Sequence, residues 1–196
     1  MPSMNRRAAI GLVAAAAATV ATQPAVSAPA NVPVIWDGKK MWETFSKDGQ
    51  GFSAPGPKGR KIAYCTIDTQ CPDCIRLMER IEPLYSKVEV IWCPIANLNI
   101  HSDAQGALIL MDKNPFAKLM EHHDNFRNPD FRGLRYDITK IPDEQRNRVW
   151  INTKLARRCG CRAVPFGVFK NSKGEYVGFD ENLLTNELAE LFEVTL

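Results

Sequence analysis

The chain has 196 residues, a formal net charge of +3 and a charged fraction of 24%. This length suits one domain with a single core. A charge so close to neutral excludes the electrostatic footprint of a protein that binds nucleic acid or an anionic membrane. Six cysteines are too few for a disulfide framework to be the main support of so long and apolar a chain.

The first thirty residues have the layout of an export signal. Arg6 and Arg7 precede an uncharged, alanine-rich run over 8–21 and a small-residue exit. The run is too short for a membrane span, so we expect residues 1–30 to be a signal peptide and the mature chain to begin at Asn31. The paired arginines fit either the Sec or the twin-arginine route. Without these two of its 25 basic residues, the mature chain has 23 against 22 acidic residues.

Residues 31–60 are expected to form an N-terminal arm or linker. The segment 41–46 could make a short helix, whereas the glycine- and proline-rich segment 51–59 cannot continue it.

A β-α-β unit is predicted next. The stretch 60–68 is short, apolar and typical of a buried strand, and 88–95 predicts a second strand of the same kind. Between them, Cys71 and Cys74 stand in the first turn of a predicted helix that Pro83 should end near Ile81.

The rest of the chain predicts a helical insertion followed by a hairpin and a closing helix. Two short helices are expected over 103–114 and 115–126, and a longer one over 143–158 that Gly160 closes. The segment 164–179 predicts two strands around a turn, and 182–192 a final helix. This order predicts an α/β, thioredoxin-like fold over 61–196, a central mixed sheet flanked by helices, with the insertion over about 99–158.

The motif Cys71-Pro72-Asp73-Cys74 carries the predicted chemistry. Unpaired amide groups and the positive end of the helix dipole favour thiolate at the first cysteine, so Cys71 should attack disulfides. Pro72 suits the first helical position because its missing N–H would have no partner there. Cys74, one turn along, is placed to resolve a mixed disulfide.

Asp73 has two interpretations. Its negative charge should oppose thiolate formation at Cys71, which would make the protein a weaker oxidant. Alternatively, it is a solvated acid that simply favours the start of the helix.

These residues resemble the bacterial periplasmic disulfide isomerases of the DsbC/DsbG type, within the thioredoxin superfamily. The resemblance runs from about residue 41 to the C-terminus and rests on MWETF, TIDTQCPDC, NTKLARRCGCRAVPFGVF and KGEYVGF. It implies that Pro165 is a cis-proline facing the two cysteines and that the Val164 backbone binds an extended substrate segment.

The resemblance also implies a periplasmic enzyme that acts on protein substrates without an organic cofactor or metal. Reductase or isomerase activity is expected rather than oxidase activity, with a membrane electron donor of the DsbD type. The family's separate N-terminal dimerisation domain has no counterpart before Lys61, so we expect a monomer or weak dimer.

Cys65, Cys93, Cys159 and Cys161 have several interpretations. Each could be a small buried hydrophobe without chemistry. One of Cys159 and Cys161 could instead form a structural disulfide with Cys93 or Cys65, or the two could form a second redox pair.

Other side chains suggest less chemistry. We expect His101, His122 and His123 to lie on the solvated surface. Asp68 could orient the active-site loop or be a plain turn residue.

The four tryptophans, Trp36, Trp42, Trp92 and Trp150, are expected to be core or arm anchors rather than a ligand box.

Two alternatives to the oxidoreductase remain. The cysteine pairs could hold zinc or copper(I), or the groove beside Pro165 could hold unfolded chains without turnover.

Overall fold

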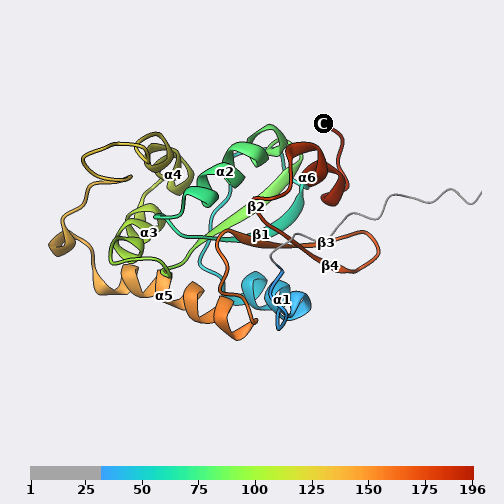
Figure 1. The fold of residues 1–196 in the computed structure, drawn as a ribbon, viewed down its shortest axis with the longest axis horizontal. Helices are drawn as coiled ribbons and strands as arrows, with labels where there is room; N and C mark the ends of the chain where they lie inside the picture. Colours follow the sequence, from blue (N-terminus) through green and yellow to red (C-terminus); the bar gives the residue numbers. More distant parts are fainter. Residues whose placement is uncertain (1–31) are drawn as a thin grey trace, which may run out of the picture.

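Figure 1 shows the protein as a computed structural model that describes residues 32–196. The predicted signal peptide and its cleavage site before Asn31 lie outside the described residues. Among residues 32–196, no helix combines the length and apolar character needed to cross a membrane.

Four strands form one mixed sheet in the order β2-β1-β3-β4. The strands are β1 (Lys61–Ile67), β2 (Val88–Pro94), β3 (Phe166–Lys170) and β4 (Tyr176–Phe179). β1 pairs with β2 in parallel and with β3 antiparallel, and β3 and β4 form the predicted hairpin. The parallel pair requires a crossover, which the helix after β1 supplies.

Six α-helices and two 3₁₀ turns complete the described residues 32–196. They are α1 (Gly38–Asp48), α2 (Pro72–Ile81), η1 (Glu82–Leu84), α3 (His101–Met111), α4 (Pro115–Asp124), η2 (Ile138–Lys140), α5 (Asp143–Arg158) and α6 (Thr185–Leu191). α2 ends at Ile81, where the sequence predicted, because the ring of Pro83 cannot continue an α-helix.

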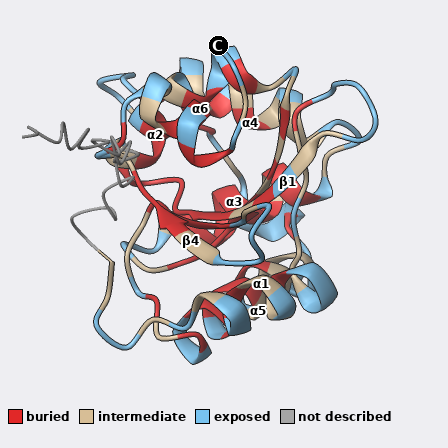
Figure 2. Ribbon diagram, turned by 90° about the vertical axis from the view of Figure 1, so that its right-hand side faces the viewer, coloured by how far each residue is buried: buried red, intermediate tan, exposed pale blue. Residues whose placement is uncertain are grey.

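The helices cover both faces of the sheet. Figure 2 shows α2 and α6 on one side and α1 and α5 on the other. One core cluster joins α2, α6 and all four strands. A second cluster lies under β3 and includes the buried α1 side chains Met41 and Phe45. Part of the segment expected to be an arm therefore packs on the sheet.

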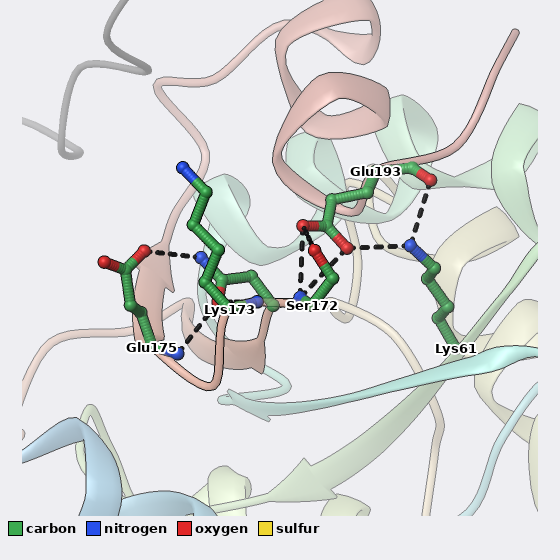
Figure 3. Close-up of polar contacts among 6 residues, drawn as sticks. Lys61, Ser172, Lys173, Glu175 and Glu193 are labelled. Atoms are coloured by element: carbon green, nitrogen blue, oxygen red, sulfur yellow. Dashed lines mark hydrogen bonds and ion pairs between the residues drawn. The ribbon is translucent and has the colours of Figure 1, made fainter.

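Polar contacts fasten the segment after α6 to the rest of the domain (Figure 3). The Lys61 ammonium donates to Glu193 Oε2 at 2.8 Å, and Ser172 Oγ donates to Glu193 Oε1 at 2.7 Å. The hydrogen bond from Lys61 is the main cause that lowers the pKa of Glu193 to about 2. This cluster lies at the start of β1. Cys71 and Cys74 follow the opposite end of the same strand.

Candidate active site at the start of α2

Cys71 is the N-cap residue of α2, with an extended backbone at φ −94° and ψ 118°. Its amide donates to Asp68 O at 3.0 Å, which closes the turn that leads from β1 into the helix. Pro72 occupies the first helical turn, as expected from its missing amide hydrogen. This arrangement leaves the Cys71 sulfur at the end of the helix where unpaired amides point.

The pKa of Cys71 is lowered from its ordinary value. The largest cause is a hydrogen bond from the Cys74 thiol, and the backbone amides of Cys74 and Asp73 lower the pKa further. Burial opposes this change, and so, more weakly, does the charge of Asp73. The donors at the helix start therefore stabilise a thiolate at Cys71.

The pKa of Cys74 moves the other way. Burial raises it well above its ordinary value, and the hydrogen bond to Cys71 raises it further. Its sulfur also accepts a hydrogen bond from the Asp68 amide at 3.3 Å. The pair therefore consists of one thiol that ionises readily and one that stays protonated.

Asp73 is partly neutralised by a neighbour. Its carboxylate pairs with Arg76 at 2.5 Å, one turn along α2, on the exposed side of the helix. The position supports both interpretations of Asp73, because it is a solvated helix-start acid whose charge still opposes the Cys71 thiolate.

The peptide bond between Val164 and Pro165 is cis, as the family resemblance implied. The Cys71 thiol donates to Val164 O at 3.4 Å. The loop before β3 therefore lies directly against the sulfur of Cys71, and Val164 is only partly buried there.

Asp68 is buried and organises the loop before Cys71. One carboxylate oxygen accepts from the Gln70 amide at 2.9 Å and Ser102 Oγ at 2.7 Å, and the other from the amides of Asn97 at 2.8 Å and Leu98 at 3.0 Å. Four donors on three segments converge on one side chain. Asp68 therefore orients the active-site loop and is not a plain turn residue.

His122 is buried, so the expectation that it lies on the surface is wrong. Its Nε2 contacts Thr69 O at 2.8 Å, and its Nδ1 accepts from the Leu134 amide at 3.3 Å. Burial is the main cause that lowers its pKa to about 4. The neutral ring therefore donates from Nε2 and ties α4 to the loop that holds Cys71.

Gly133 makes room for that ring. Its φ is +74°, and a Cβ built there would lie 2.1 Å from His122 Cε1. A side chain at residue 133 would need both an unfavourable backbone and a displaced histidine.

Gln70 and Gln105 form a second link between the insertion and the active-site loop, which the sequence patterns did not predict. Gln70 Nε2 donates to Gln105 Oε1 at 2.6 Å, and an Arg132 guanidinium N–H donates to Gln70 O at 3.0 Å. Gln105 also donates to the carbonyls of Arg132 and Leu134. The one signal in the sequence is a glutamine inside the otherwise apolar stretch that became α3.

The sheet register separates Cys65 from Cys93. Cys65 pairs with Trp92 and Thr66 pairs with Cys93, so the two cysteines point to opposite faces of the sheet. Cys93 belongs to the same cluster as Cys159 and Cys161, whereas Cys65 lies in the cluster under α2. A disulfide between Cys65 and either Cys159 or Cys161 would therefore have to cross the sheet, whereas Cys93 lies on the same side as both.

All six cysteines are buried free thiols. Burial raises the pKa of Cys65 and Cys93 well above the ordinary value, that of Cys161 to about 12, and that of Cys159 in the same direction. These four thiols, whose pKa values are raised, are therefore weak nucleophiles. Their surroundings fit the interpretation of small buried hydrophobes.

Within residues 32–196, no group of three or more histidine, cysteine, aspartate or glutamate side chains is arranged to hold a metal ion. The two cysteine pairs lie in different clusters, so they do not form the four-thiolate site that the metal hypothesis needs.

Several solved structures have a similar fold. Proteus mirabilis ScsC in a compact conformation matches with 17% identity and a TM-score of 0.60, over 81% of this chain and 79% of that one. A periplasmic thioredoxin-like protein from Salmonella enterica serovar Typhimurium matches with 17% identity and a TM-score of 0.58, over 78% and 94%.

A disulfide interchange protein from Neisseria gonorrhoeae matches with 18% identity and a TM-score of 0.53, over 74% and 94%. No protein-family model matches the sequence, and no curated protein matches it. At such low identities the likeness establishes the fold, and it confirms the predicted thioredoxin-like class.

Proposed function

We propose that this protein is an exported thiol-disulfide oxidoreductase that acts on protein substrates through Cys71 and Cys74. The observation that carries the proposal is the position of Cys71. It caps α2 with a lowered pKa, and its sulfur lies 3.4 Å from Val164 O in the loop with the cis-proline. The structural neighbours named as thiol-disulfide and periplasmic proteins support the same activity and the same compartment.

The reaction begins at the Cys71 thiolate. It attacks one sulfur of a substrate disulfide, the substrate S–S bond breaks, and the second substrate cysteine leaves as a thiolate that takes up a proton. Cys74 then loses its proton and attacks the Cys71 sulfur, which releases the first substrate cysteine. The substrate gains two electrons, and Cys71 and Cys74 become a disulfide.

Val164 and Pro165 form the substrate-binding part of the proposal. The Val164 carbonyl next to the Cys71 sulfur is a backbone acceptor for an extended substrate chain. In the isomerase variant of the reaction, another thiol of the substrate resolves the mixed disulfide in place of Cys74.

The direction of electron flow in this proposal is reduction or isomerisation rather than oxidation. Asp73 supports it, because its charge opposes the Cys71 thiolate and so favours a less oxidising couple. A membrane electron donor of the DsbD type would return the disulfide to two thiols. The metal-binding hypothesis loses support because the described cysteine pairs lie apart.

The test is the reduction potential of the Cys71/Cys74 couple, together with reduction of insulin by the wild-type protein. We expect turnover of insulin and a potential clearly below the value of about −120 mV that marks the strong oxidant DsbA. A potential at that value would assign an oxidase. A protein that binds insulin chains without reducing them would be a holding chaperone.

The oligomeric state stays a prediction. We expect a monomer or weak dimer, and sedimentation at micromolar concentration checks it. A tight dimer would overturn the prediction and direct attention to α1, on which Trp42 is partly exposed.

A further inference from the structure

A groove opens between the loop after β2 and the outer face of α5. Its volume is about 430 Å³, and its wall is the segment 96–100 together with Asp103, Arg146, Trp150 and Arg157. None of these side chains takes part in the exchange reaction proposed above.

The groove wall is bonded to both segments that flank Cys71. The amides of Asn97 and Leu98 donate to Asp68, whose carbonyl accepts from the Cys71 amide. The Asn97 side chain donates to Arg162 O at 3.2 Å, two residues before Val164. The groove therefore adjoins the segment that lies against the Cys71 sulfur, and a chain laid along Val164 and Arg162 would continue toward it.

Three large apolar side chains in the groove face solvent. Leu98 is 51% exposed, Ile100 is 82% exposed and Trp150 is 39% exposed. The expectation that Trp150 is a core or arm anchor is therefore wrong. Grouped exposed apolar side chains mark interaction sites, and tryptophan is enriched among the residues that dominate binding energy.

The charge of the groove is positive. Arg146 is paired with Asp103 at 2.6 Å, so its charge is compensated. Arg157 donates to Asn97 Oδ1 at 3.1 Å but, within the part of the chain that the structure describes, makes no ion pair. Trp150 and Arg157 are seven residues apart on α5 and so share one face of the helix.

We propose that this groove binds an extended segment of the substrate protein next to the cysteine that Cys71 attacks. The segment carries an apolar side chain that packs on Leu98, Ile100 and Trp150, and a carboxylate that pairs with Arg157. The inference rests on the proposed function, because it names the class of substrate sequence that the same site selects.

Binding of two peptides without cysteine tests the groove apart from the chemistry. Both are extended, fluorescently labelled peptides with serine at the cysteine position and one bulky apolar residue, and they differ by a glutamate or a lysine nearby. We expect the wild-type protein to bind the glutamate peptide severalfold more tightly, as judged by fluorescence anisotropy, because an exposed charge pair supplies a ratio of that size.

Single substitutions at the groove should change this result in defined ways. Ile100→Ser should weaken both peptides severalfold, and Arg157→Glu should reverse the preference between them. Both side chains are exposed, so the fold should survive, and circular dichroism checks it. Ile62→Ser, on a 40% exposed apolar residue near the start of β1, is the matched control and should leave peptide binding unchanged.

Other results would overturn the inference. Equal binding of the two peptides by the wild type, or equal losses in Ile100→Ser and Ile62→Ser, would remove the groove from substrate recognition. Self-association that Ile100→Ser abolishes would assign the groove to a second copy of the chain.

Insulin reduction by the wild type is measured in parallel. If insulin is reduced but the peptides do not distinguish the groove variants, then the inference fails and the proposed function stands. If insulin is not reduced, then the proposed function fails, and with it the role of the groove in selecting substrates for exchange.

Discussion

Cys71 lies at the N-terminal end of a helix, and Cys159 lies at the C-terminal end of another. Cys71 caps the start of α2, where amide hydrogens and a hydrogen bond from Cys74 lower its pKa. Cys159 caps the end of α5, where carbonyl groups point outward and burial raises its pKa. The same side chain thus becomes a nucleophile where hydrogen-bond donors reach its sulfur and an inert core residue where burial dominates.

The surroundings of the two cysteines also differ between the two sides of the sheet. On the side of Cys71, polar groups of the insertion are bonded to the active-site loop through Asp68, Gln70 and His122. On the side of Cys159, the cysteines are packed among apolar residues such as Met41 and Phe45. Polar contacts therefore organise the loop that holds Cys71, whereas apolar packing surrounds Cys93, Cys159 and Cys161.

The largest expected effect is on exchange itself. Cys71→Ala should abolish insulin reduction, because it removes the nucleophile. Cys74→Ala should instead accumulate mixed disulfides between Cys71 and the substrate, visible on non-reducing gels. Cys159→Ala is the matched control, and an equal loss of turnover in this variant would erase the distinction between the two helix ends.

Asp68→Asn should cost about 3 to 4 kcal/mol of unfolding free energy. The new amide group would replace one carboxylate oxygen and face buried donors that then have no acceptor. Chemical denaturation measures the loss, and Asp124→Asn at the end of α4 provides an exposed control. A loss below about 1 kcal/mol would show that the loop does not depend on Asp68.

His122 should make stability depend on pH. Its pKa is about 4 in the folded protein against about 6.5 in the unfolded chain, so between these values the unfolded chain binds more protons. Stability from this group is complete above pH 6.5 and falls as the pH drops toward 4. From pH 7 to pH 5 the loss should be about 2 kcal/mol.

Urea unfolding at pH 7 and at pH 5 measures this loss of unfolding free energy. His122→Gln keeps a donor for Thr69 O and should show a loss smaller by about 2 kcal/mol than the wild type. The same pH dependence in both proteins would mean that His122 is not held neutral in the fold.

The smallest effect is expected on the other side of the sheet. Cys161→Ala removes a fully buried sulfur and should cost about 1 to 2 kcal/mol of unfolding free energy with unchanged insulin turnover. Denaturation and the insulin assay are read together. Reduced turnover in a folded Cys161→Ala protein would revive the second redox pair.

Sequence patterns predicted the elements that depend on local signals. The β-α-β unit, the end of α2 two residues before Pro83 and the hairpin all follow from residues close together in the chain. The cis bond before Pro165 came from the family resemblance, since nothing local requires it.

The missed features depend on contacts between distant segments. The face on which Cys93 lies is set by the register of β1 and β2, and alternation within one strand does not define it. The burial of His122 requires Thr69 and Gly133 to meet its ring, 53 residues before it and 11 after. Histidine on a polar helix has no local signal for such a position.

The most direct test of the account is to map which cysteine reacts first. The reduced protein is treated with iodoacetamide at about pH 6, and the label at each of the six cysteines is followed by mass spectrometry. We expect Cys71 to be alkylated well before Cys74, Cys159 and the other thiols, because its pKa is lowered while theirs are raised. Faster labelling of Cys74 or Cys159 than of Cys71 would contradict the assignment of Cys71 as the nucleophile.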